Sequence, residues 1–126
     1  MSNAELRLWA VRGATKAKHN DPEAIVKATE ELMRELIARN DLEPERIVSC
    51  IFTSTHDLNA EFPAVAARKL GLNQVPLLCA REVDVPGAMV SVIRTLVHYY
   101  APSDHTPTHA YLGEAQELRA DLKAAQ

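Results

Sequence analysis

The chain has 126 residues, of which 47% are hydrophobic and 5% aromatic, and its formal net charge at pH 7 is -3. This length favours one domain with an aliphatic core. The negative balance argues against a nucleic-acid surface, and no apolar run is long enough to cross a membrane. The two cysteines are too few for a disulfide framework and are interpreted as reduced thiols of a cytoplasmic protein.

The first half of the chain predicts a strand and then a helix. Residues 5–12 alternate between two faces and predict a strand that ends at Gly13. Asp21 and Pro22 predict a helix start, because aspartate caps the first turn and proline fits the first helical position. Apolar residues at helical spacing extend that helix to about residues 39–40.

The middle of the chain predicts two strands around a short helix. Residues 46–54 are rich in Ile, Val, Phe and Cys, which favours a strand. Pro63 begins a short helix, and Gly71 ends it. Residues 75–79 predict a third strand, with proline near its start, where a strand tolerates it.

The last third of the chain predicts a third helix and a fourth strand. Apolar residues between positions 88 and 100 recur at helical spacing, which predicts a helix with Ser91, Arg94 and His98 on its opposite face. Residues 108–112 predict a strand. The resulting order of elements predicts an α+β or mixed α/β fold. The chain is interpreted as one domain over residues 1–126, with 1–4 disordered or added by cloning and 114–126 a mobile tail.

One predicted strand-to-helix junction brings a thiol, a carboxylate and a guanidinium together. Cys79-Ala80-Arg81-Glu82 is followed by Val83-Asp84-Val85-Pro86-Gly87, and Arg94 comes seven residues after that glycine. Two further motifs accompany it, residues 9–15 (WAVRGAT) and residues 109–112 (HAYL). Together these motifs resemble the small, trimeric, mixed α/β class of chorismate mutase, and the resemblance runs from about Leu8 to Asp121.

The resemblance implies an assembly and a reaction. The assembly is a homotrimer whose sheets form a pseudo α/β barrel, with active sites between neighbouring subunits. The reaction is the conversion of chorismate to prephenate in phenylalanine and tyrosine synthesis. It requires no cofactor and no metal, and it involves neither a nucleic-acid nor a membrane partner.

The resemblance also assigns roles to individual residues. Arg94 would face the ether oxygen, Glu82 would accept a hydrogen bond from the substrate hydroxyl, and Arg12 would bind a carboxylate. The remaining residues that would bind the substrate are Tyr111, Cys79, Phe62, Ala64, Arg68, Leu118 and Arg119. Within that set, residues 62–68 would come from the neighbouring subunit, and residues 118–119 would belong to a tail that covers the site.

Two other interpretations of the chain stay open. One is a trimeric small-molecule binding or regulatory protein that keeps the fold without turnover, and the other is an imine-deaminase-type enzyme with a site between subunits. The segment Ser54-Thr55-His56-Asp57 holds hydrolase-type residues but lacks the glycines of a nucleophile elbow, so it is interpreted as a loop. His105 and His109 are four residues apart, but Pro107 between them argues against a helical metal site.

Overall fold

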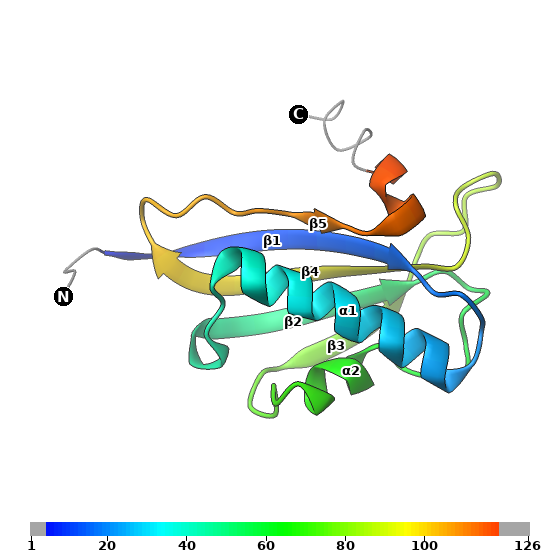
Figure 1. Ribbon diagram of the computed structural model, residues 1–126, viewed down its shortest axis with the longest axis horizontal. Helices are drawn as coiled ribbons and strands as arrows, with labels where there is room; N and C mark the ends of the chain where they lie inside the picture. The colour runs from blue at the N-terminus through cyan, green and yellow to red at the C-terminus, as the bar shows by residue number, and fades with distance from the viewer. Residues whose placement is uncertain (1–4, 119–126) are drawn as a thin grey trace.

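The computed structural model describes residues 5–118, which form one mixed sheet with two α-helices against it (Figure 1). The elements in chain order are β1 (Leu6–Lys16), α1 (Pro22–Asn40), the 3-10 turn η1 (Pro44–Arg46), β2 (Ile47–Ser54), α2 (Ala64–Lys69), β3 (Leu77–Arg81), β4 (Val92–Pro102), β5 (Ala110–Tyr111) and the 3-10 turn η2 (Gly113–Glu117). The strand order within the described residues is β3-β2-β4-β1-β5. β4 pairs antiparallel with β1 and β2, whereas β5 and β3 pair parallel with those same two strands.

The long helix α1 forms as the sequence predicts. The Asp21 side chain accepts a hydrogen bond of 2.8 Å from the Ala24 amide, and Pro22 occupies the first helical position. The helix ends where Asp41 adopts a left-handed conformation with φ 49°. Its apolar stripe packs on the sheet, so that α1 and the strands enclose a continuous core whose fully buried members include Val11, Leu32, Leu36, Phe52 and Val97.

The predicted third helix is wrong, because this segment forms strand β4 in the middle of the sheet. Its apolar residues lie on both faces of the strand, and this hid the alternation and produced an apparent helical period. The inner face carries β-branched and aromatic side chains that favour a strand, and all are buried: Ile93, Thr95, Val97 and Tyr99. Arg94 and His98 therefore share the outer face of a strand.

The other helix and strand boundaries differ from the predictions by a few residues. The short helix α2 ends before Gly71, whose φ is +90°. Strand β3 begins and ends two residues later than predicted, and β5 is shorter than predicted. β1 does not end at Gly13 but continues to Lys16, since this glycine lets the strand lie close against α1.

Gly13→Ala is expected to destabilise the fold by about 1–3 kcal/mol, a typical cost of overpacking. A Cβ at this position would lie 2.8 Å from Leu32 Cδ1 and 3.0 Å from the Ala110 carbonyl oxygen. The leucine could move, but the carbonyl belongs to the neighbouring strand and could not. Urea unfolding should show a lower midpoint at an unchanged m-value, and a wild-type midpoint would contradict the close approach.

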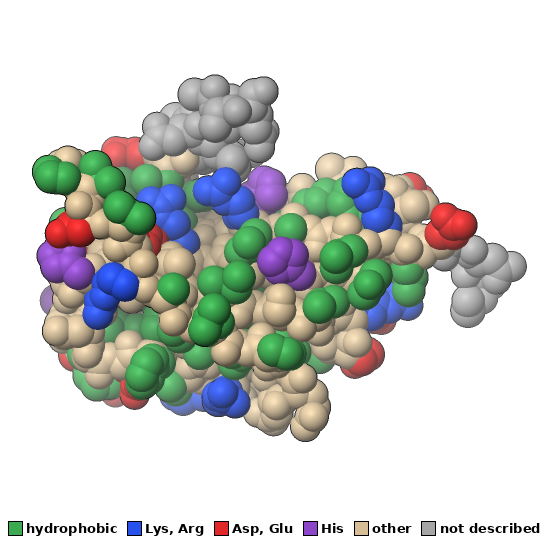
Figure 2. Space-filling view, turned by 180° about the vertical axis from the view of Figure 1, so that it is seen from behind, with side chains coloured by type: hydrophobic (Ala, Val, Ile, Leu, Met, Phe, Trp, Pro, Cys, Tyr) green, Lys and Arg blue, Asp and Glu red, His purple; other side chains and the backbone are tan. Residues whose placement is uncertain are grey.

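Both α-helices cover the same face of the sheet, and the opposite face carries exposed apolar side chains (Figures 1 and 2). The exposed fractions there reach 49% for Leu8, 61% for Leu78 and 44% for Tyr100. We call this surface, with Leu6, Leu8, Ile51, Leu78, Leu96 and Tyr100, the uncovered face; the strand registers place these side chains on one side. No helix within residues 5–118 is long and apolar enough to span a bilayer.

Candidate active site

A row of paired residues crosses four neighbouring strands at one end of the uncovered face. The strand registers align Thr53 of β2 with Arg94 of β4, Arg94 with Ala14 of β1, and Ala14 with Tyr111 of β5. Because paired residues in neighbouring strands point to the same face, these four side chains lie side by side. Arg94 occupies the central strand, and Tyr111 is two strands away, or about 10 Å at the usual strand spacing.

Arg94 is held in a hydrogen-bonded cluster with Glu82 and Thr53. Its Nε donates to Glu82 Oε2 at 3.0 Å, and Thr53 Oγ1 donates to the same oxygen at 2.7 Å. The Glu82 backbone amide also donates to the Ser54 carbonyl, so this carboxylate is fixed at both its main chain and its side chain. The Glu82 side chain is only 15% exposed and that of Arg94 36%. Among the described residues, Arg94 has no other partner, so its terminal nitrogens can donate to a ligand.

Arg12 lies on the same face as Arg94, one register step along the sheet. It pairs with Leu96, and the diagonal neighbour across β1 and β4 is Arg94, at a typical Cα separation of about 7–8 Å. The Arg12 backbone amide donates to His109 Nδ1 at 3.0 Å, while its side chain is exposed. The two guanidinium groups therefore place positive charge on one patch of the uncovered face.

Tyr111 and Leu118 close one side of this patch. They pack with Ala14 and Ala115 in a small apolar cluster that covers Ala14 completely. The turn η2 is tied to the end of β1 by an ion pair of 2.9 Å between Lys16 and Glu114. Arg119, the other tail residue predicted for the site, lies outside the described residues.

The remaining predicted site residues form a second group at the β3 edge of the sheet. Cys79 pairs with the buried Phe52 and packs against the core, so its side chain lies on the helix-covered face rather than beside Glu82. Cys79 and Phe62 line the same pocket of about 420 Å³, and Phe62 is 68% exposed. Ala64 is half-buried and Arg68 exposed on α2. A single chain therefore does not bring this group to Arg94.

The two thiols are expected to differ in reactivity. Cys50 is fully buried, and this burial raises the pKa of its thiol to about 12. At pH 8 the Cys50 thiol should therefore stay protonated and inaccessible, whereas Cys79 is partly exposed. Mass spectrometry after maleimide treatment should find modification of Cys50 only in unfolded protein. Rapid labelling of Cys50 in the native protein would contradict this burial.

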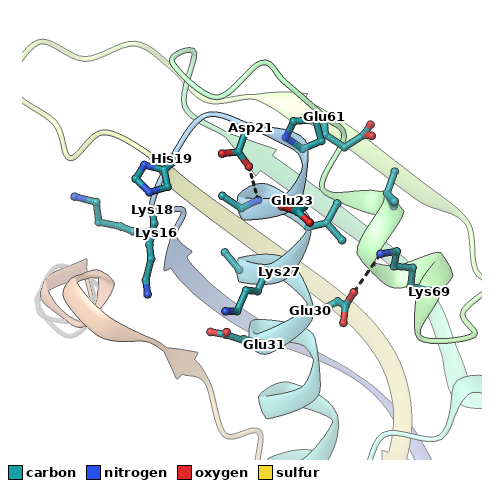
Figure 3. Close-up of a pocket in the computed structure, with 15 residues that line it drawn as sticks. Lys16, Lys18, His19, Asp21, Glu23, Lys27, Glu30, Glu31, Glu61 and Lys69 are labelled. Atoms are coloured by element: carbon teal, nitrogen blue, oxygen red, sulfur yellow. Dashed lines mark hydrogen bonds and ion pairs between the residues drawn. The ribbon is translucent and has the colours of Figure 1, made fainter.

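A larger open groove of about 810 Å³ runs along the first half of α1, away from the Arg94 cluster (Figure 3). Lys16, Lys18 and His19 lie on one side of the helix, and Glu61 and Lys69 lie on the other. Further carboxylates, Glu23, Glu30 and Glu31, line the groove as well. This mixture of charges opposes binding of a dianion, and none of the predicted site residues lines the groove.

Thr53 and His109 hold predicted site residues in place, and their roles were not predicted. The Thr53 hydroxyl donates a hydrogen bond to the Glu82 carboxylate, and the His109 ring accepts a hydrogen bond from the Arg12 amide. His109 falls in the HAYL motif, but nothing in the sequence shows that it reaches β1. Thr53 could have been found only from the register between β2 and β4, which a wrong third helix concealed.

Two arginines, a carboxylate and a tyrosine therefore lie at one end of the sheet of a mixed α/β fold, an arrangement suited to binding a small anion. A family model described as chorismate mutase type I matches residues 8–122, so the chain belongs to that family.

Two curated relatives and one solved structure agree with this assignment. The chain is 45% identical to the chorismate mutase AroH of Thermus thermophilus over 92% of this chain and 97% of the relative. It is 37% identical to the chorismate mutase AroH of Bacillus subtilis strain 168 over 93% of this chain and 94% of that relative. A solved chorismate mutase from Clostridium thermocellum superimposes with a TM-score of 0.82 at 41% identity, covering 86% of this chain and 98% of that one. The predicted mixed α/β class is thus confirmed.

Proposed function

We propose that this chain is a cytoplasmic chorismate mutase that rearranges chorismate to prephenate as a homotrimer, without a cofactor, for phenylalanine and tyrosine synthesis. Membership of the type I family supports the reaction. The fixed pair of Arg94 and Glu82, 3.0 Å apart and facing the same way as Arg12, carries the mechanism.

The chemistry of chorismate explains why such a site is sufficient. Chorismate carries two carboxylates, an enol ether and a ring hydroxyl, and its rearrangement is intramolecular, so no proton transfer or covalent intermediate is needed. The flexible side chain must be folded over the ring, which is a problem of orientation. As the ether C–O bond breaks, negative charge accumulates on its oxygen, and a fixed cation there stabilises the transition state more than the ground state.

Arg94, Glu82, Arg12 and Tyr111 divide these tasks among them. The terminal nitrogens of Arg94 would donate to the ether oxygen, while Glu82 holds Nε and accepts from the substrate hydroxyl. Arg12 and the Tyr111 hydroxyl would bind the carboxylates. Because Thr53 already orients Glu82 before substrate arrives, little reorganisation is left for the reaction step.

The homotrimer completes a site that one chain has only in part. The Arg94 group lies on the uncovered face, whereas Phe62, Arg68 and Cys79 lie at the β3 edge on the other side. An exposed face with Leu8, Leu78 and Tyr100 also favours association, because burying apolar surface stabilises an interface. In the trimer, the β3-edge group of one subunit would form a wall over the Arg94 row of the next, and the tail with Leu118 and Arg119 would cover it.

The direct test is to add chorismate to the purified protein and follow the loss of its ultraviolet absorbance, with prephenate identified by proton NMR. We expect turnover that chelators do not affect and that requires no added metal or nucleotide. Saturable binding of chorismate without prephenate would instead support the non-catalytic binding protein. Release of ammonia from an imine substrate, with no action on chorismate, would support the deaminase.

A further inference from the structure

The residues that precede β4 form an exposed loop between the two charged members of the site. Residues 83–90 connect Glu82 to the start of β4, and Val83 at their beginning is 86% exposed. Inside the loop, the backbone bonds are local, from Val85 to Val83 and from Ala88 to Val85. A loop with so few contacts cannot fix the position of Arg94 by itself.

Ser91 ends this loop in a conformation that the surroundings must enforce. Its φ is 59°, in the left-handed region that residues with a Cβ rarely adopt. The Asp57 carboxylate holds it with two bonds, accepting the Ser91 amide on Oδ1 at 3.2 Å and the Ser91 hydroxyl on Oδ2 at 2.8 Å. On the other side, the Ala17 amide donates to the Ser91 carbonyl at 2.9 Å.

The next residue, Val92, is held by the same segment of chain. Its amide donates to Thr55 Oγ1 at 3.1 Å, and its carbonyl accepts from the Thr55 amide at 3.1 Å. The Arg81 guanidinium in turn donates to the carbonyls of Thr55 and Leu58, which ties this segment to the end of β3. Asp57 and Thr55 therefore hold Ser91 and Val92 by hydrogen bonds. These two residues lie three and two positions before Arg94.

The Asp57 carboxyl is suited to this role because it is charged. Burial alone would raise its pKa, but hydrogen bonds from the side chains of Thr55 and Ser91 and from the backbone outweigh that effect and lower the pKa below its ordinary value. At neutral pH the group is therefore a carboxylate, which accepts stronger hydrogen bonds than a neutral amide.

We propose that Asp57 is a positioning residue for Arg94, which acts by clamping Ser91 in its left-handed conformation and so fixing where β4 enters the sheet. This inference rests on the proposed function. Without the clamp, Ser91 would relax toward ordinary φ values, and the first residues of β4 would shift with it. A displacement of about 1 Å at a reacting group can cost about 100-fold in rate.

Asp57→Ala is expected to lower kcat by about 10- to 100-fold, while the KM for chorismate changes much less. Asp57→Asn keeps one acceptor oxygen and should lose less, and it serves as the second variant if Asp57→Ala does not fold. Asp84→Ala is the matched control, because Asp84 is an exposed carboxylate in the 83–90 loop whose side chain pairs only with His56, at 3.3 Å, among the described residues. Its kcat should be unchanged.

A double-mutant cycle separates positioning from general stability. If Asp57 acts through Arg94, then Asp57→Ala should cost almost nothing in an Arg94→Ala background, because the group it positions is gone. If Asp57→Ala lowered kcat by the same factor in the wild-type and the Arg94→Ala backgrounds, the proposal would be overturned. A folded Asp57→Ala variant with wild-type kcat would also overturn it.

One readout does not depend on turnover and keeps the clamp separate from the proposed function. The Arg94 Nε–H donates to Glu82, so its side-chain NMR signal should exchange slowly with solvent in the wild type. In Asp57→Ala it should exchange at least about 10-fold faster, as expected when a fixed hydrogen bond opens more often. Unchanged exchange would overturn the proposal even in a protein that turns over chorismate, and faster exchange would support the clamp even in one that does not.

Discussion

Arg94→Ala is expected to lower kcat on chorismate by at least roughly 10²–10³-fold, the usual cost of removing one preorganised donor from an active site. The loss should fall on kcat rather than KM, because the charge that this guanidinium opposes develops in the transition state. Arg94→Lys should recover only part of the rate. Lysine keeps the charge but has no Nε to donate to Glu82 while other nitrogens face the substrate.

Arg34→Ala provides a matched control for this variant. Arg34 is also an arginine with one carboxylate partner, Glu30 at 3.8 Å, but its side chain is 66% exposed and it lies on α1. Its kcat should equal that of the wild type. The comparison counts only where circular dichroism and oligomer mass are unchanged. A correctly folded Arg94→Ala protein with wild-type kcat would refute the mechanism.

Leu8→Glu is expected to dissociate the proposed trimer and lower activity by at least about 100-fold. Leu8 is 49% exposed on the uncovered face and lies three register steps from Arg94, so the substitution leaves the catalytic row untouched. A carboxylate there would be desolvated in a subunit interface, which is unfavourable when the charge is unpaired. The separated chain would lack the wall proposed for Phe62 and Arg68 of the neighbouring subunit, and its rate would fall for that reason.

The control for Leu8→Glu is a glutamate introduced on the helix-covered side of the sheet. Ala38 is exposed on α1, and Ala38→Glu should remain trimeric and active. Sedimentation equilibrium and chorismate turnover should be measured on both variants at the same concentration. Full activity of a monomeric Leu8→Glu protein would mean that one chain holds a complete site.

Local signals predicted the fold well where a single period dominates a segment. The cap at Asp21, the proline after it and a one-sided apolar stripe specify α1 without any tertiary information. β4 could not be predicted in this way, because it is the central strand of a sheet with apolar residues on both faces. The left-handed Ser91 immediately before it also has no sequence signal comparable to the glycine at position 87.

The resemblance assigned Arg94 and Glu82 to one site even though the element predicted for Arg94 was wrong. The structure places them 3.0 Å apart because β3 and β4 flank β2 and β3 ends at the edge of the sheet where β4 begins, not because a helix follows a strand. The contacts of Thr53 and Asp57 depend on strand register and on a backbone conformation, and neither can be deduced from residue spacing. Residues 55–57 of the segment Ser54-Thr55-His56-Asp57 form a loop as predicted, whereas Ser54 ends β2. The hydrogen bonds from this loop to Ser91 and Val92 could not be deduced from the sequence.

Subunit mixing tests the central claim that Arg94 of one chain and Arg68 of its neighbour build one site. Arg94→Ala and Arg68→Ala proteins should each show low kcat/KM on chorismate as homotrimers. The two proteins are then unfolded together in equal amounts and refolded. With random assembly, about a quarter of the interfaces combine an intact Arg94 with an intact Arg68 of the neighbouring chain. The account predicts recovery of about a quarter of the wild-type kcat/KM per chain. A mixture no more active than the mean of its two parents would contradict it.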